Sequence, residues 1–312
     1  MTNYMCELYM MNICNYMINA EHPYNSLYEN KLPELDLSKI KNNDIIYMYL
    51  KKDILYHFIL NTLPHITVNF KLITGLSDDT APYSSDYDKN EHYETLLNNI
   101  YLTRWYAVNK DCDHPKIVAI PIGTVKSLPI SSGIKYLAWY SNRTNRHIMT
   151  NYLDNIKETP FQLMRNKEKL IYISYSTPNT ESTNYTKNLN LRSNLDNYII
   201  NNTNFIKNTL VFWEQYMEDM RKCKFSLIPG GIGIDNYRII ETILVGTIPI
   251  LLYHHTLYEE LYSDLPVIII NDFSQINEVY LNEQYEILVN RTNYNFDKIL
   301  KSYWINRILN DI

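Results

Sequence analysis

Residues 224–252 read KFSLIPGGIGIDNYRIIETILVGTIPILL, and this stretch decides the fold class. It starts with a short apolar segment, continues through a glycine-rich turn and an amphipathic helical pattern, and ends in a second apolar segment. Such an order is typical of two parallel strands joined by a helix. We expect Asp235 to be the N-cap of the helix and Gly246 to end it. The stretch therefore predicts an α/β fold with parallel sheets.

The turn in this stretch has the composition of a diphosphate site. Gly230, Gly231 and Gly233 let the backbone turn sharply and approach a ligand, and they leave free N–H groups at a helix N-terminus. Arg238 and Glu241 lie on one helical face, where the guanidinium can neutralise phosphate and the carboxylate can accept from ribose hydroxyls. The alternative is a structural turn in which these two side chains form a solvated ion pair. A Walker loop is excluded, because no Gly-Lys-Ser/Thr follows.

Strands and helices alternate on both sides of this stretch. The chain of 312 residues is long enough for two domains, and a polar segment at 151–168 is the expected crossing between them. We therefore predict an N-terminal domain at 1–160 and a C-terminal domain at 161–312. Expected strands are 44–50, 66–75, 116–123, 169–176, 224–229, 247–252 and 265–270. Expected helices are 51–63, 190–200, 213–223, 274–288 and 295–309, and 94–109 reads as a helix followed by a strand.

Composition and charge exclude several functional classes. The formal net charge of -5 leaves no basic footprint for nucleic acid. Cys6, Cys14, Cys112 and Cys223 have no paired metal spacing and are too few for a disulfide framework, which favours a reducing compartment. No signal peptide or membrane span is expected, so we predict a cytoplasmic or viral-factory location, with virion association as a variant of it. The excess of Asn, Ile, Lys and Tyr predicts an A/T-rich source such as a large DNA virus.

The stretch at 224–252 also resembles the C-terminal block of exostosin-like glycosyltransferases. The shared order is a lysine-phenylalanine strand, a Pro-Gly turn, Gly-x-Asp-x-x-Arg, a Glu three residues later and then Gly-x-Ile-Pro. The similarity continues through Tyr258, Leu261 and LPVIIINDF at 265–273. Looser matches are LITGLSDD at 72–79, WYAVN at 105–109, HPKIVAIPIG at 114–123, and the pair Asn190 and Arg192.

The resemblance implies a GT-B architecture, in which two Rossmann-like domains face each other across a cleft and a C-terminal helix crosses back. The donor nucleotide would bind the C-terminal domain and the acceptor the N-terminal one. Arg238 would hold the donor phosphate, Glu241 the ribose or sugar, and Arg192 would add positive charge near the diphosphate. Gly230, Gly231, Gly233 and Asp235 would shape the donor loop. Where relatives commonly have Arg after the Pro of the turn, this chain has Gly, so one phosphate contact is missing.

An inverting transferase needs a base for the acceptor hydroxyl. Asp78 and Asp79 are the best candidates, because they follow a predicted strand at the end where open α/β sheets bind ligands. The alternative for this pair is a solvated turn. His114 is the second candidate, and its alternative is a capping or core histidine. Asp111-Cys112-Asp113 fits the metal-binding Asp-x-Asp pattern of the other major glycosyltransferase fold, but the C-terminal block supplies a donor site without metal, so we predict metal independence.

The expected function is transfer of a sugar from a nucleotide-sugar, with UDP-sugars favoured, to a hydroxyl of a glycan or protein. No cofactor beyond the donor and no metal is expected. A second class is an inactive relative that binds nucleotide or glycan as a scaffold or virion component, and a third is an unrelated α/β nucleotide-binding enzyme. Tyr172, Tyr175 and Tyr253 are candidates for stacking on the base, although packing is the alternative for each.

Overall fold

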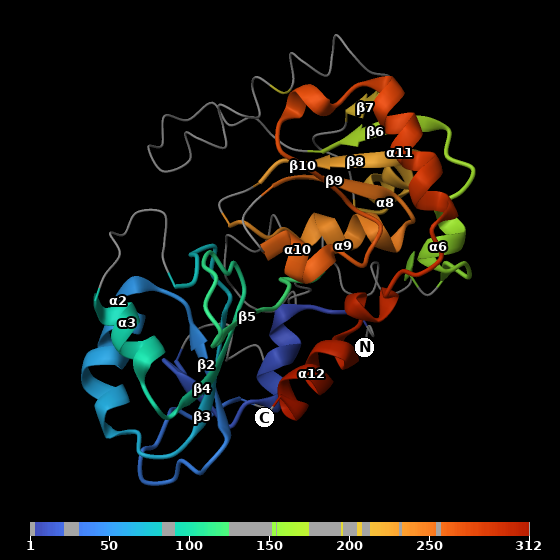
Figure 1. Cartoon of the computed structure of the whole chain (residues 1–312). Helices are drawn as coiled ribbons and strands as arrows, with labels where there is room; N and C mark the ends of the chain where they lie inside the picture. Colours follow the sequence, from blue (N-terminus) through green and yellow to red (C-terminus); the bar gives the residue numbers. More distant parts are fainter. Residues whose placement is uncertain are drawn as a thin grey trace.

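The chain forms two lobes, each built around a parallel β-sheet (Figure 1). The computed structural model describes residues 4–21, 31–82, 91–124, 152–153, 155–174, 195, 205–207, 213–230, 233–253 and 257–311. Each sheet has five described strands, and every strand pair is parallel. The predicted α/β class with parallel sheets is confirmed.

The N-terminal sheet has the order β1-β2-β3-β4-β5, so its strands follow one another in space as they do in sequence. Right-handed crossovers that all advance in one direction place their helices on a single face of the sheet. The strands are β1 Tyr16–Ile18, β2 Asp44–Tyr49, β3 Phe70–Gly75, β4 Leu102–Ala107 and β5 Ile117–Ala119. The crossover helices are α2 Lys52–His57, the π-helical η2 Phe58–Thr62, the 3-10 helix η3 Leu63–His65, and α3 Glu91–Asn98.

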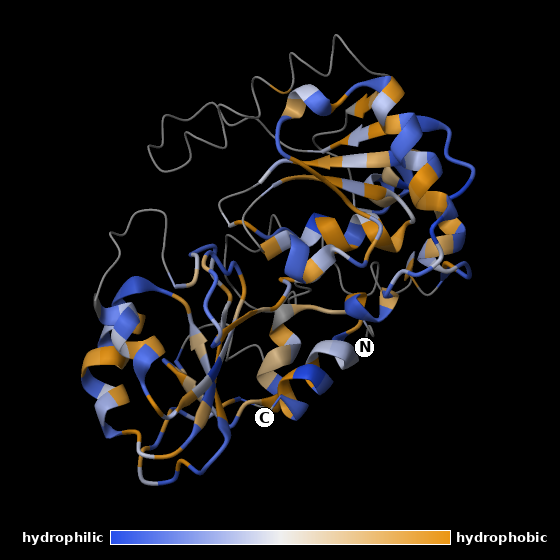
Figure 2. Cartoon of the chain, viewed as in Figure 1, coloured by the Kyte–Doolittle hydropathy of each residue, from blue (hydrophilic) through white to orange (hydrophobic). Residues whose placement is uncertain are grey.

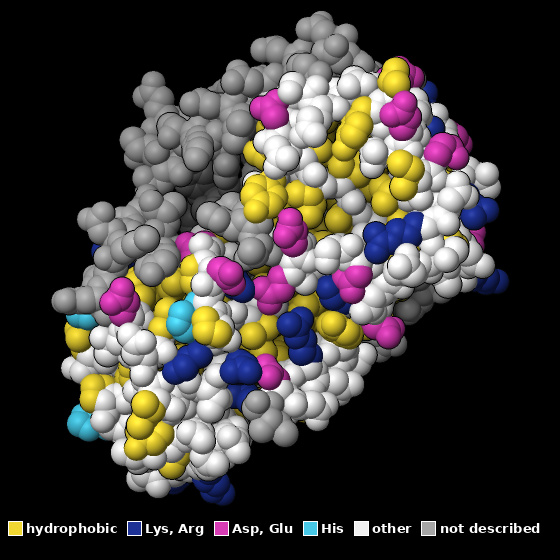
Figure 3. All heavy atoms as spheres, viewed as in Figure 1, with side chains coloured by type: hydrophobic (Ala, Val, Ile, Leu, Met, Phe, Trp, Pro, Cys, Tyr) yellow, Lys and Arg dark blue, Asp and Glu magenta, His cyan; other side chains and the backbone are white. Residues whose placement is uncertain are grey.

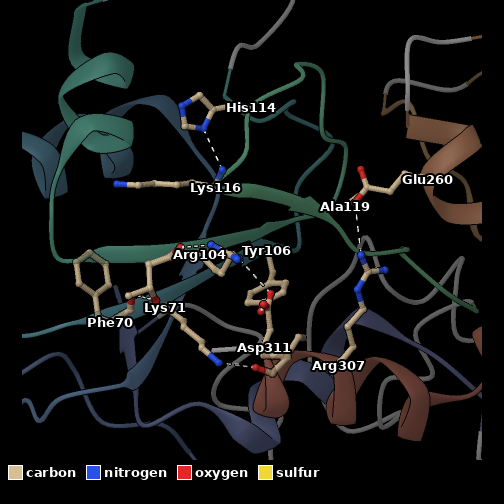
Figure 4. Close-up of polar contacts among 12 residues, drawn as sticks. Phe70, Lys71, Arg104, Tyr106, His114, Lys116, Ala119, Glu260, Arg307 and Asp311 are labelled. Atoms are coloured by element: carbon tan, nitrogen blue, oxygen red, sulfur yellow. Dashed lines mark hydrogen bonds and ion pairs between the residues drawn. The ribbon is translucent and has the colours of Figure 1, made fainter.

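The opposite face of this sheet is covered by the two ends of the described chain. The 3-10 helix η1, Glu7–Ile13, and the last helix α12, Lys301–Asn310, contact each other there. The Nζ of Lys71 donates to the carbonyl of Ile308 at 2.7 Å and so caps the end of α12. Asp311 accepts from Arg104 Nε at 3.2 Å and from the Tyr106 hydroxyl at 2.7 Å (Figure 4). The C-terminal helix therefore crosses back to the N-terminal lobe.

The C-terminal sheet has the order β7-β6-β8-β9-β10, in which the chain moves outward from β6 to β7 and then returns past β6 to β8. This reversal creates a topological switch point between β6 and β8. The strands are β6 Lys169–Ile173, β7 Phe205–Lys207, β8 Cys223–Ile228, β9 Ile248–Leu252 and β10 Ile268–Ile270. The helices are α6 Pro160–Leu163, α8 Trp213–Arg221, α9 Tyr237–Leu244, α10 Leu257–Tyr262, η5 Phe273–Gln275, α11 Glu278–Asn290 and η6 Phe296–Ile299.

One hydrophobic core is shared by the two lobes. Helices α9 and α10 lie between the C-terminal sheet and the N-terminal lobe, whereas α11 covers the outer face (Figures 1 and 2). The shared core joins Tyr47 and Tyr106 of the N-terminal sheet, Ile239 and Tyr258 of the C-terminal lobe, and Trp304 of α12. Two further cores line the outer faces of the sheets. The two lobes are therefore packed against each other through apolar side chains.

The local predictions are largely confirmed where the structure describes them. Helix α9 ends as expected at Gly246, which has φ +67. The amide of Thr247 donates to the carbonyl of Thr242 and that of Gly246 to Ile243, which is the Schellman pattern. The elements that were not predicted include η1, β1, β7 and α10. The helix expected at 190–200 lies outside the described residues, apart from Leu195. None of the helices in the described ranges combines the length and the apolar character needed to cross a membrane.

Candidate functional site

The glycine-rich turn follows β8 directly and lies at the switch point of the C-terminal sheet. Strand β8 ends at Ile228, and Pro229 and Gly230 follow it, beside the end of β6 at Ile173. In open α/β sheets, ligands bind in the crevice at such a point, outside the carboxyl ends of the strands. Gly231 and Arg192 lie outside the described residues, so their predicted roles stay predictions.

Helix α9 begins one residue later than predicted. Its N-cap is Asn236, whose side-chain oxygen accepts from the backbone N–H of Arg238 at 3.0 Å. The prediction that Asp235 is the N-cap is wrong, because its carboxylate is bound by other groups. Arg238 is consequently the second residue of the helix, so its guanidinium lies in the first turn, at the positive end of the helix dipole, where anions are favoured.

The carboxylate of Asp235 joins the two lobes. It is 4 % exposed, and its Oδ2 accepts from the amide of Ile122, in the loop after β5, at 2.7 Å. Its Oδ1 accepts from the hydroxyl of Tyr262 on α10 at 2.7 Å and from the amide of Asn236 at 2.8 Å. Burial and this charge raise the pKa of Tyr262 well above its usual value. Asp235 thus anchors the glycine-rich turn to the N-terminal lobe, and its predicted role in a donor loop stays a prediction.

Gly233 is required by a side chain of the other lobe. A Cβ on Gly233 would lie 2.8 Å from the amide nitrogen of Asn109, closer than real Cβ atoms come. Asn109 is fully buried, and its Oδ1 accepts from the amide of Asp235 at 2.7 Å. The predicted reason for this glycine was close approach to a ligand. The structure instead shows close approach of Asn109.

We expect Gly233→Ala to lower the free energy of unfolding by about 1–3 kcal/mol, as overpacked cores do. The new methyl group would push the Asn109 amide away from its hydrogen-bond partners. A double-mutant cycle measured by urea denaturation with Asn109→Ala checks the cause, because removing the amide removes the clash. Equal costs of Gly233→Ala in both backgrounds would contradict it.

Glu241 and Arg238 are not a solvated ion pair. Glu241 is 1 % exposed, and its Oε1 accepts from the indole N–H of Trp213 on α8 at 3.3 Å. Arg238 is half-buried and lies over the ring of Tyr237, 5.4 Å from its centroid. Burial, and then the charge of Glu241, raise the pKa of Tyr216, while the charge of Arg238 lowers it. Arg238 and Glu241 therefore act on one cluster between α8 and α9, and the alternative of a solvated pair is wrong.

The loop after β3 carries Asp78 and Asp79 beside the C-terminal lobe. The carbonyl of Ser77, which precedes them, accepts from the Asn109 amide nitrogen at 3.3 Å, so this loop and Asp235 contact the same side chain. Asp79 is half-buried and lies 3.3 Å from the Nζ of Lys51. Burial lowers the pKa of Lys51, but Asp79, with smaller contributions from Tyr49 and Asp78, outweighs it and the net shift is upward. The predicted base loop and the predicted donor loop thus lie near each other.

His114 lies away from this place. It precedes β5 by three residues, at the amino end of that strand, whereas Asp78 and Asp79 follow the carboxyl end of β3. Its Nδ1 accepts from the amide of Lys116 at 3.2 Å (Figure 4). Burial and two nearby lysines lower its pKa. The structure does not bring His114 together with the other candidates, and its side chain caps a turn, which was the alternative.

The remaining candidates from the sequence differ in how buried their side chains are and in what they contact. The side chain of Asp111 in the Asp-x-Asp segment accepts a hydrogen bond from the Thr80 hydroxyl, and Asp113 is exposed. Tyr172 is fully buried against Tyr216, with ring centroids 5.7 Å apart, so it packs and offers no face for a base. Tyr253 is 47 % exposed and follows the carboxyl end of β9. Tyr175 lies outside the described residues.

A second polar junction reinforces the first. Glu260 of α10 accepts from Lys110 Nζ at 2.7 Å and from the amide of Ala119 at 2.9 Å. It also lies 3.9 Å from a guanidinium nitrogen of Arg307 (Figure 4). Acidic and basic side chains accordingly lie side by side on the surface where the lobes meet (Figure 3). Sequence reasoning missed Glu260, Tyr262 and the role of Asn109. Of these three residues, only Asn109 had a sequence signal, because it is the last residue of the WYAVN segment at 105–109.

No protein-family model and no curated protein sequence matches the chain. The resemblance to exostosin-like glycosyltransferases therefore stays a prediction. What the fold establishes is coarser: two parallel five-stranded sheets, compatible with a two-domain Rossmann-like arrangement.

Proposed function

We propose that the chain is a glycosyltransferase of GT-B architecture that uses a nucleotide-sugar, with UDP-sugars favoured. The observation that carries this proposal is the position of the glycine-rich turn. Pro229 and Gly230 leave β8 at the β6/β8 switch point, and α9 follows with Arg238 in its first turn. A helix N-terminus, a guanidinium and a strand-end crevice are together suited to a diphosphate.

The two lobes supply complementary groups for an inverting, metal-independent transfer. The acceptor hydroxyl oxygen would attack the anomeric carbon, the bond from that carbon to the diphosphate would break, and the hydroxyl proton would pass to a carboxylate. Asp79 or Asp78 is the proposed base, since their loop reaches the C-terminal lobe through Asn109. Arg238 and the N-terminus of α9 would stabilise the diphosphate as it leaves with the bonding electrons.

Glu241 is proposed to bind a hydroxyl of the ribose or the sugar from its buried position in the C-terminal lobe. It is buried and accepts from Trp213, so the structure places its carboxylate inside the α8–α9 packing. A ribose hydroxyl would have to reach it from the switch-point side. The proposed acceptor is a hydroxyl of a glycan or a protein, in a cytoplasmic or virus-associated setting.

Arg238→Ala is expected to weaken binding of the preferred donor about tenfold to a hundredfold, because a charge-assisted hydrogen bond contributes about 1.5–3 kcal/mol. Calorimetry against UDP-, GDP- and CMP-sugars with EDTA present measures this effect. The matched control is Arg221→Ala, which removes the last residue of α8, next to the amino end of β8 and away from the glycine-rich turn, and it is expected to leave affinity unchanged.

The panel also separates the competing functions. Failure of every donor to bind, or an equal loss in both arginine variants, would overturn the donor-site assignment. Donor binding without hydrolysis or transfer would favour an inactive relative. Binding that requires a divalent cation would refute metal independence.

A further inference from the structure

Asn109 connects two loops that the proposed function assigns to different tasks. Its Oδ1 accepts from the amide of Asp235 at 2.7 Å, and its Nδ2 donates to the carbonyl of Ser77 at 3.3 Å. Asp235 immediately precedes the N-cap of α9, and Ser77 immediately precedes Asp78. One side-chain amide therefore spans the gap between the donor loop and the base loop.

The residue type at this position is strongly restricted. The backbone of Asn109 has φ 58, in the left-handed region that Asn enters more readily than other residues with a Cβ. The primary amide has an oxygen that accepts and an N–H₂ group that donates, and both groups form hydrogen bonds here. Aspartate would keep the acceptor for Asp235 but lose the donor for Ser77. Glycine would keep the backbone conformation but lose both side-chain bonds.

The donor side of this bridge is fixed from several directions. Asp235 is bound by Ile122 and Tyr262, and the hydroxyl of Tyr258 donates to the carbonyl of Ile234 at 2.6 Å. The methylene of Gly233 packs directly on the Asn109 amide. Because these groups are buried and close-packed, a change in the backbone at 233–235 is transmitted to the amide rather than absorbed by solvent.

The base side of the bridge is more exposed to solvent. Asp78 is exposed and Asp79 half-buried, and the described side-chain contacts of this loop include Lys51 to Asp79 and Ser77 Oγ to the Asp79 amide. The backbone of Ala81 donates to the carbonyl of Asn109 at 3.0 Å, so the same residue contacts the loop at both ends.

We propose that Asn109 is a positioning residue that couples occupancy of the glycine-rich turn to the placement of the loop bearing Asp78 and Asp79. The proposal rests on the proposed function. A diphosphate that orders the backbone before α9 would fix the position of the Asp235 backbone N–H. The side-chain amide of Asn109, which accepts from that N–H, would then be fixed as well. Its hydrogen bond to the Ser77 carbonyl would in turn fix the start of the base loop. Donor binding in one lobe thereby orders the base in the other.

Hydrogen exchange measured by mass spectrometry tests the coupling directly. We expect saturating UDP to slow exchange of amides in 76–82 of the wild-type protein roughly fivefold, as a locally ordered loop would. The same addition should leave that segment unchanged in Asn109→Asp and Asn109→Gly, although both variants still bind UDP by calorimetry. Segment 278–290, on the outer face of the C-terminal sheet, serves as the internal control and should not change.

Steady-state kinetics with the preferred donor give a second readout. We expect both variants to lower kcat at least tenfold while KM for the donor changes less than threefold, the pattern expected when the base is misplaced but the donor still binds. Two variants guard against misfolding, because only Asn109→Asp introduces a charge. Binding of UDP to the wild type with unchanged exchange in 76–82, or slowed exchange of that segment in both variants, overturns this proposal alone. Failure of UDP and other nucleotides to bind the wild type overturns the proposed function as well.

Discussion

Replacing Asp235 with alanine is expected to lower the free energy of unfolding by about 3 kcal/mol, with a thermal midpoint roughly 5 °C lower. The substitution leaves the amide of Ile122 and the hydroxyl of Tyr262 without their acceptor, and a buried donor without a partner costs about 1–3 kcal/mol. The apolar methyl group cannot compensate, because the surrounding donors stay in place. Urea denaturation and differential scanning calorimetry measure the loss.

Two further variants sharpen this test. Asp235→Asn keeps an oxygen for one set of donors but turns an N–H₂ group toward another, so its cost should fall between those of wild type and alanine. Asp297→Ala removes an exposed aspartate in the same lobe and should change stability by less than about 0.5 kcal/mol. A loss below about 1 kcal/mol for Asp235→Ala would show that the junction does not stabilise the protein.

Replacing Trp304 with alanine should cost about 3–5 kcal/mol, the range for deletion of a large buried aromatic side chain. Trp304 of α12 is fully buried in the shared core, and its indole N–H donates to the carbonyl of Lys298 at 2.7 Å. The cavity would open where the C-terminal helix covers the N-terminal sheet. We therefore expect loss of protease resistance in both lobes, which limited proteolysis with mass spectrometry can locate.

Leu309→Ala is the matched control on the same helix. Leu309 is 51 % exposed, so its truncation should leave stability within about 0.5 kcal/mol of wild type. Cleavage confined to the C-terminal lobe of Trp304→Ala would contradict a shared core.

Local sequence patterns predicted individual elements well. The apolar run and glycine stop around α9 gave its C-terminus at Gly246, and β-branched runs gave β2, β8 and β9 at nearly their observed positions. These signals are local, because strand and helix periodicity depends on neighbours a few residues apart. Helix α10 was not predicted, because its six residues are too few to show a helical repeat of apolar residues.

The site was predicted less completely, because its contacts join residues that are far apart in the sequence. Asp235 has the residue type of an N-cap, but Asn236 next to it has the same preference, and the competition is decided by Ile122 and Tyr262. Gly233 looked like a phosphate-binding glycine, yet the group that excludes a Cβ is Asn109. Such distinctions depend on which loop of the other lobe is adjacent, and no periodicity in the sequence encodes that.

The return of α12 to the first lobe has a consequence for biosynthesis. The inner face of the N-terminal sheet, with Lys71, Arg104 and Tyr106, is completed by residues that leave the ribosome only after the entire second lobe. Until then, apolar side chains such as Tyr47 and Ile73 lack part of their cover. We therefore expect the first lobe to stay incompletely folded during translation. Its sequential strand order alone would suggest independent folding, but we expect it to depend on chaperones until α12 is made.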